Sequence, residues 1–209
     1  THALSLNFLP AWLRSLEART SGGPIQLVSD VAAHCEAQLQ HGRVQFLLCH
    51  GHERAPSGLD PASFVSCEVG RDELLPVCAP DAQGRPRFKL EAAAPRRGAK
   101  AALPMLAYST ESGLGRVLRS LHGAALEAPG REVVFTAHLA TVLRSLALEG
   151  RGLAFLPASL VREDLAAGRL VAAGGAGWTI ALSVRLYRPR AALSAVAEKF
   201  WAAASQGAG

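Results

Sequence analysis

One short segment of this 209-residue sequence gathers residues that can bind metals. It reads Cys49-His50-Gly51-His52-Glu53 and follows an apolar run that predicts a strand. Thiolate and imidazole groups at this spacing can bind a transition metal, but they are too few to close a site without ligands from elsewhere. A solvated loop is the simpler interpretation, so we predict no metal and no cofactor.

The cysteines are too widely spaced for a CxxC redox or zinc motif; they are Cys35, Cys49, Cys67 and Cys78. We therefore expect reduced thiols and a cytoplasmic protein. A thiol sensor needs an accessible sulfur near positive charge. Cys67 precedes Arg71 by four residues and Cys49 adjoins His50, so these two cysteines are the candidates for redox sensing. Both lie in apolar runs, which favours buried structural cysteines instead.

Small polar residues and histidines come just before several predicted helices. In open α/β sheets, ligands bind beyond the carboxyl ends of the strands, where helix N-termini attract anions. Each such residue also suits a helix N-cap, as does Ser112 before the helix predicted over 113–122, and the two roles are compatible. The candidates for contact with a small-molecule effector are Thr1, His2, Ser29, Ser109, Thr110, Thr136 and His138. Phe155 could add an apolar wall, although core packing accounts for it equally well.

The sequence lacks the motifs of common enzymes. It has no Gly-x-Ser-x-Gly elbow, no P-loop, no His-Glu-x-x-His and no dinucleotide-binding glycine pattern after a strand. The acids Asp30, Asp72 and Asp164 stand alone, at expected caps or turns. We therefore predict that the chain is not an enzyme.

The distribution of charge argues against a protein that binds nucleic acid directly, and the hydropathy argues against one that spans a membrane. The chain carries 22 Lys and Arg against 17 Asp and Glu, and the basic residues are scattered rather than clustered. The densest pair, Arg96-Arg97, falls in a connection rich in Pro and Ala over 85–102, so we expect no direct nucleic-acid surface. No apolar window is long enough to cross a membrane.

Helical and strand patterns alternate along the chain. The first half predicts a helix from residue 2 to about 18–21, a strand over 24–29, a helix over 30–40, a strand over 43–50 that suits a parallel sheet, and an extended stretch over 64–79 interrupted at Gly70. The second half predicts strands over 104–109, 131–136, 152–156, 170–171 and 178–187, with helices over 113–122, 138–149, 157–168 and 193–204.

This order predicts an α/β protein of two Rossmann-like lobes. The long extended stretches near 68–80 and 178–188 are expected to cross between the lobes. Lobe I then comprises 1–78 and 187–209, and lobe II comprises 79–186. A ligand cleft is expected between them.

One stretch resembles a signature of LysR-type transcriptional regulators. Residues 150–161 read GRGLAFLPASLV and are followed by Gly168-Arg169-Leu170-Val171. Further segments resemble the effector-binding domain of that family in the right order: 2–16, 38–48, 70–80, 104–114 and 182–190. The amino-acid sequence of these segments is most similar to a LysR subgroup that includes a hypochlorite-responsive member. Gln45 replaces the family's usual Asp after the glycine that precedes the strand.

The resemblance implies a periplasmic-binding-protein type II-like fold that senses a small, anionic effector. DNA binding would reside in an N-terminal winged helix-turn-helix that is absent from this sequence. It also implies a homodimer of this domain and a homotetramer at full length. The first helix (Leu6, Leu13) and the edges of the helix predicted over 30–40 are candidate contacts. Two alternatives stay open: a free-standing periplasmic solute-binding protein, and a regulator that senses redox state through a thiol.

Overall fold

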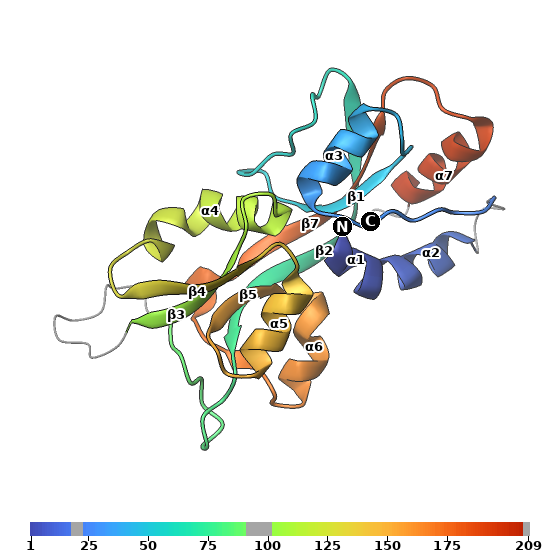
Figure 1. Cartoon of the computed structure of the whole chain (residues 1–209). Coiled ribbons are helices and arrows are strands. Elements are labelled where there is room, and N and C mark those ends of the chain that lie inside the picture. The colour runs from blue at the N-terminus through green and yellow to red at the C-terminus, as the bar shows by residue number, and fades with distance from the viewer. Residues whose placement is uncertain (18–22, 91–101, 207–209) are drawn as a thin grey trace. The chain divides into compact units, whose positions relative to one another are not determined.

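The computed structural model describes residues 1–17, 23–90 and 102–206. They form an α/β fold, which confirms the predicted class, and they divide into two compact units (Figure 1). Unit 1 comprises 1–72 and 182–209, and unit 2 comprises 73–181. The boundaries fall within the same two strands as the predicted boundaries at 78 and 187. The expected end of the first helix and most of the 85–102 connection lie outside the described residues.

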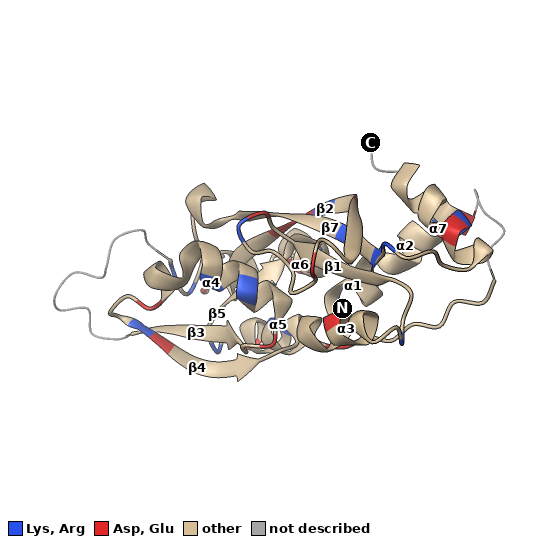
Figure 2. Cartoon of the chain, turned by 90° about the horizontal axis from the view of Figure 1, so that it is seen from above, with Lys and Arg blue, Asp and Glu red and all other residues tan. Residues whose placement is uncertain are grey.

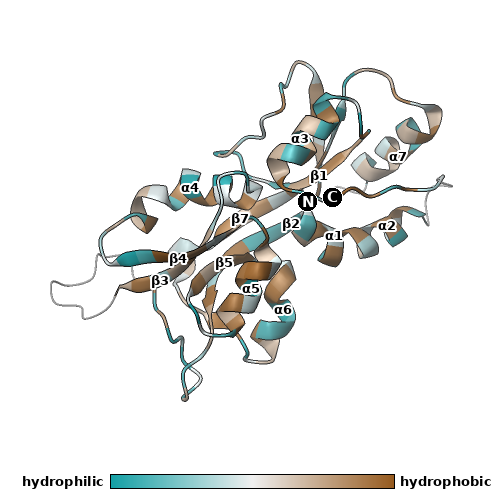
Figure 3. Cartoon of the chain, viewed as in Figure 1, coloured by the Kyte–Doolittle hydropathy of each residue, from teal (hydrophilic) through white to brown (hydrophobic). Residues whose placement is uncertain are grey.

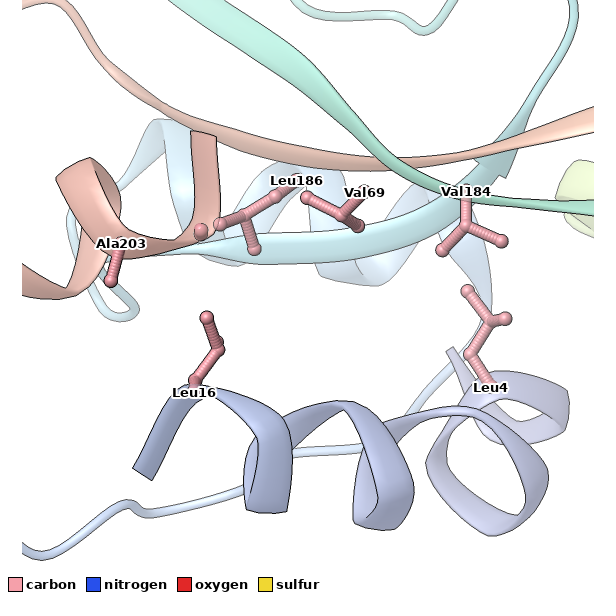
Figure 4. Packing of buried hydrophobic residues seen from close by; sticks show 7 residues of the cluster. Leu4, Leu16, Val69, Val184, Leu186 and Ala203 are labelled. Carbon is pink, nitrogen blue, oxygen red and sulfur yellow. The ribbon is translucent and has the colours of Figure 1, made fainter. Parts of the chain in front are cut away.

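Unit 1 packs helices around three strands, ordered β1-β7-β2. Its elements are α1 (His2–Asn7), α2 (Leu9–Glu17), α3 (Ala32–Gln40), β1 (Leu47–Gly51), the first part of β2 (Phe64–Cys78), the last part of β7 (Ile180–Pro189) and α7 (Ala195–Gln206). Leu4 and Leu16 from the first two helices meet Val69 and Leu186 from the strands in a shared core (Figure 4). A second cluster joins α3 to β1 through Leu39 and Leu47.

The strands of unit 2 are ordered β2-β5-β3-β4, with β6 on β2. Its elements are β3 (Leu103–Tyr108), α4 (Gly113–Leu126), β4 (Arg131–Ala137), α5 (Ala140–Leu148), β5 (Leu153–Pro157), α6 (Ala158–Ala166), β6 (Val171–Ala172) and the short 3-10 turn η1 (Ala176–Trp178). In Figure 1, α4 lies on the opposite side of the β3 and β5 strands from α5 and α6. β3 is parallel to both β4 and β5, as the strand–helix alternation predicts.

The structure corrects four expectations in unit 1. The first helix is two helices, separated at Phe8, because Pro10 in the next turn has no N–H to continue the ladder. Residues 24–29 form no strand, and Ile25 and Leu27 are each 55% exposed, so their alternation faces no core. β1 is shorter than predicted and antiparallel to β7, a partner more than 130 residues away in the chain that the neighbouring residues do not reveal. β2 runs unbroken through Gly70, against which the Phe8 ring packs.

Charged residues are spread over both units. In the view of Figure 2 the blue and red segments are dispersed along the ribbon. Among the described residues, no helix is long and apolar enough to span a bilayer.

Candidate functional site

The predicted contact residues of unit 2 meet at one edge of its sheet. β3 and β4 are parallel neighbours, with Ala107 opposite Thr136, so both strands end at the same level. The Ser109 backbone N–H donates to the Ala137 carbonyl at 3.0 Å, which joins the two strand ends. Ser109 and Thr110 therefore lie beside Thr136 and His138. We call these four residues the unit-2 polar edge.

Two helices begin at the unit-2 polar edge, and they differ in how their first N–H groups are satisfied. At α4, the Ser112 hydroxyl accepts a hydrogen bond from the Gly115 N–H at 3.3 Å, which is the N-cap that the sequence predicts. At α5, the N-cap residue is Leu139, and no side chain bonds the first N–H groups. The start of α5 thus keeps donors and the positive end of its dipole for a polar ligand.

A carboxylate and a guanidinium flank this edge. Arg119 donates to the carbonyls of Ser109 at 3.2 Å and Thr110 at 3.1 Å, which fixes the turn into α4. The Glu111 carboxylate accepts from the Thr110 hydroxyl at 3.1 Å. The Ser109 side chain, the Glu111 backbone and Thr110 together hold the pKa of Glu111 below its usual range, and His138 adds to the effect. Charges of both signs therefore border the polar edge, and the sequence reasoning missed Glu111 and Arg119.

Two aromatic residues of unit 2 lie in its core. Phe155 is only 2% exposed on β5, and its ring packs near His122 and Trp178, so it does not belong to the polar edge. Tyr108, at the end of β3, is buried, and its hydroxyl has no hydrogen-bond partner among the described residues. Burial raises the pKa of this phenol strongly.

In unit 1, two predicted contact residues that are far apart in the sequence, His2 and Ser29, lie close together. The Ser29 hydroxyl lies 3.3 Å from His2 Nδ1 and 2.9 Å from the Ser5 hydroxyl. Ser5 in turn donates to the Thr1 carbonyl, and the backbone nitrogen of Thr1 donates to the Leu48 carbonyl at 3.0 Å. Sequence reasoning missed Ser5, although its spacing of four from Thr1 places both on one helix face. Thr1, His2, Ser5 and Ser29 form what we call the unit-1 polar cluster.

A carboxylate also adjoins the unit-1 polar cluster. Asp30 Oδ1 accepts from the Val31 N–H at 2.7 Å, at the entry to α3. This bond lowers the pKa of Asp30, and the nearby His34 and His2 lower it further against a smaller opposing effect of burial. Asp30 therefore carries a negative charge at neutral pH. It adjoins Ser29, which we expect to contact an effector.

The structure shows where the candidate residues for redox sensing and metal binding lie. All four cysteines are free thiols. Cys49 is buried in the cluster of α3 and β1, and Cys67 packs against the other core cluster of unit 1. Burial raises the pKa of Cys67 more than the nearby Arg185 lowers it, which disfavours a reactive thiolate. No group of three potential metal ligands exists in the part of the chain that the structure describes.

Two acids that looked isolated in the sequence are buried and paired. The Asp72 side chain is 4% exposed and contacts His50. Asp164 is fully buried and contacts Arg144 and Arg169. Sequence spacing could not reveal His50 and Arg144, because they come from other segments of the fold, whereas Arg169 lies in the turn directly after the helix that carries Asp164.

The glycine pair of the 150–161 stretch has a packing reason. Gly150 ends α5 with a φ of +71°, a conformation that favours glycine. A Cβ on Gly152 would lie 2.9 Å from the Pro104 carbonyl oxygen, so only glycine lets β5 approach β3 here. The following Leu153–Pro157 strand is fully buried, and α6 begins directly after Pro157.

Comparison with known proteins decides the family, because the model of the LysR substrate binding domain matches residues 1–209. The chain belongs to this family. It is 26% identical over 200 residues to the HTH-type transcriptional regulator YjiE of Escherichia coli K12, covering 96% of this chain and 61% of that protein. The LysR-type domain thus spans about three-fifths of this relative's length.

Solved structures agree with the family assignment. The regulatory domain of HypT from Salmonella typhimurium, in its apo form, is 25% identical with a TM-score of 0.77, over 98% of this chain and 90% of that one. The full-length structure of HypT, described as a hypochlorite-specific LysR-type transcriptional regulator, matches with a TM-score of 0.78. At 25% identity, the match covers 99% of this chain and 65% of that one. The chain is therefore an effector-binding domain of the LysR type with a periplasmic-binding-protein type II-like fold. Neither a transport protein nor a thiol sensor is favoured.

Proposed function

We propose that this LysR-type domain binds a small polar effector at the unit-2 polar edge, with a second set of contacts in the unit-1 polar cluster. The observation that carries the proposal is the pairing of β3 with β4. It brings Ser109, Thr110, Thr136 and His138 to the uncapped start of α5. Hydroxyl and imidazole groups beside free helix N–H groups suit an anionic or strongly polar ligand.

Charge refines the class of effector. The start of α5 and His138 favour a negatively charged or hydrogen-bond-accepting group. Glu111 disfavours a second negative charge at the same edge, and its lowered pKa keeps it ionised at neutral pH. We therefore propose an effector with one anionic group and further hydrogen-bond donors, rather than a multiply charged anion.

Binding measurements on matched variants test this site. Native mass spectrometry of the purified chain, followed by calorimetry with small monocarboxylates, dicarboxylates and their uncharged amides, identifies a ligand that the wild type binds. Thr136→Ala and Ser109→Ala should each weaken that binding about tenfold, as expected for the loss of one hydrogen bond to a charged group. Ser145→Ala is the control, because its hydroxyl bonds only the Thr141 carbonyl within α5. Wild-type affinity in both test variants would move the site elsewhere.

The same measurements examine the unit-1 polar cluster separately. Ser29→Ala removes the hydroxyl shared by His2 and Ser5. A loss of affinity in Ser29→Ala equal to that in Thr136→Ala indicates that both sets contact the ligand. A loss confined to Thr136→Ala restricts the site to unit 2.

We propose that the whole protein is a cytoplasmic, non-enzymatic transcriptional regulator that binds DNA through a separate N-terminal domain. The family model and the relative YjiE, a transcriptional regulator, support this. Effector binding would change DNA affinity only to the extent that it favours one conformation, typically by about 1–3 kcal/mol.

We also propose a homodimer of this domain and a homotetramer of the whole protein. Strand β4 ends the sheet and exposes Val133, Val134 and Phe135 by 60%, 45% and 39%, which Figure 3 shows as a brown stretch after a teal start. The predicted contact Leu6 is 64% exposed, whereas Leu13 packs against the core of unit 1. Light scattering should show a dimer that Phe135→Asp weakens. Val196→Asp, 55% exposed on α7, is the control.

A further inference from the structure

The end of β1 lies where the chain leaves unit 1. On β2 the boundary between the units follows Asp72, and on β7 it precedes Leu182. Gly51, the last residue of β1, pairs with Ser183 of β7, and His50 pairs with Val184. The end of β1 is therefore at the level at which β7 enters unit 1.

Polar side chains bind the end of β1 to both of these strands. His50 donates from Nε2 to Oδ2 of Asp72 on β2, at 3.0 Å. The Ser183 hydroxyl of β7 donates to the Gly51 carbonyl at 3.1 Å. Both bonds lie within two residues of a unit boundary. Deeper in unit 1, the same three strands contribute apolar side chains such as Val69, Val184 and Leu186.

Burial gives the His50–Asp72 contact two distinct states. The side chains are only 3% and 4% exposed, so water does not compete for the bond while it is formed. Separating the pair would leave a carboxylate and an imidazole without each other in a buried setting, which is strongly unfavourable. Opening the contact therefore costs free energy and requires movement of the surrounding strands.

We propose that the His50–Asp72 pair is a conformational latch that fixes β2 at the point where this strand leaves unit 1. While the pair is closed, β2 keeps one position against β1, and the short segments around Asp72 and Leu182 are held rigid. When the pair opens, both segments gain freedom together, because β7 lies between β1 and β2 in the sheet. This inference goes beyond effector binding and does not depend on the identity of the effector.

Amide hydrogen exchange measures the latch directly on the whole chain. Asp72→Asn weakens the bond and keeps the shape of the side chain, and His50→Gln removes the imidazole from the other side. Each variant should speed exchange of the amides in 70–75 and 180–185 about tenfold, equivalent to about 1.4 kcal/mol of local opening. The double variant should exchange no faster than either single variant, because both remove the same bond.

A variant in unit 2 separates local opening from general destabilisation. Asp164→Asn breaks another buried contact, with Arg144 and Arg169, away from both boundaries. It should lower the melting temperature without a selective rise of exchange in 70–75 and 180–185. Selective opening in His50→Gln or Asp72→Asn supports the latch, and if one of them does not fold, the other decides. Exchange in these segments that is unchanged, or that rises equally in Asp164→Asn, overturns it.

Discussion

The carboxylate of Asp164 accepts two hydrogen bonds from the guanidinium of Arg169, at 2.9 and 2.7 Å, from within a fully buried position. Arg144 on α5 bonds the other carboxylate oxygen, so one acid of α6 joins α5 to the turn that follows α6. Burial alone would raise the pKa of Asp164, but the bonds from Arg144 and Arg169 outweigh it and lower the pKa.

Asp164→Asn should therefore destabilise the chain. The arginines are 31% and 52% exposed, so solvent stabilises them when the acid is replaced. We expect the free energy of unfolding to fall by about 2–3 kcal/mol, at or below the lower end for a broken buried pair. Urea denaturation measures this loss. Arg169→Met should cost less, because Arg144 still satisfies the acid, and an equal loss in both variants would contradict the shared role of the arginines.

Stability should depend on pH through Glu198. Bonds from Arg188 and from the Leu193 N–H lower the pKa of Glu198 from 4.5 to about 2 in the folded chain. Since the folded state holds this proton less tightly than the unfolded state, the contribution is present above about pH 4.5 and is lost as the pH falls towards 2. Thermal unfolding between pH 6 and 2.5 should show this loss, and Glu198→Gln should show a shallower decline. Parallel curves for the two proteins would exclude the assignment.

Glycine at position 152 should be required for the approach of β5 to β3. A Cβ there would lie 2.9 Å from the Pro104 carbonyl oxygen and 3.1 Å from Leu106 Cγ. Gly152→Ala should cost about 1–3 kcal/mol, as other overpacked cores do. Gly175→Ala is the matched control, since Gly175 has a φ of −76° and no atom near the added methyl. Chemical denaturation that finds the two variants equally stable would refute the packing argument.

Removing the Tyr108 hydroxyl should stabilise the chain. The hydroxyl is buried without a partner among the described residues, so folding removes it from water without replacing its hydrogen bond. Tyr108→Phe should raise the free energy of unfolding by about 1 kcal/mol. A loss of stability in the same denaturation experiment would mean that the phenol has a polar partner in solution.

Local signals in the sequence predicted most of unit 2. Gly150 and Gly168, both with positive φ, end α5 and α6 close to where the sequence places those ends. The sequence also places Ser112 ahead of α4, and its hydroxyl caps that helix. Such features depend on neighbouring residues only, which is why spacing and residue type suffice to find them.

Features that depend on distant segments escaped prediction. Residues 24–29 have the alternation of a strand, but a strand also needs a neighbour to pair with, and alternation does not supply one. The antiparallel pairing of β1, the Asp164–Arg144 contact and the burial of Asp72 against His50 all join separate segments. For the candidate site, the sequence pointed to the ends of β3 and β4 but not to Glu111, in the turn before α4, nor to Arg119 and Ser5, which lie on helices.

The pairing of β1 with β7 also constrains how the chain folds during synthesis. Among the described strands, β1 pairs only with residues 183–187 of β7, and these emerge from the ribosome after the whole of unit 2. Unit 2 is one continuous stretch and can fold before synthesis ends. The backbone of Leu47–Gly51 must wait for more than 130 residues until β7 arrives to pair with it, so the nascent first half carries an open strand edge that chaperones have reason to protect.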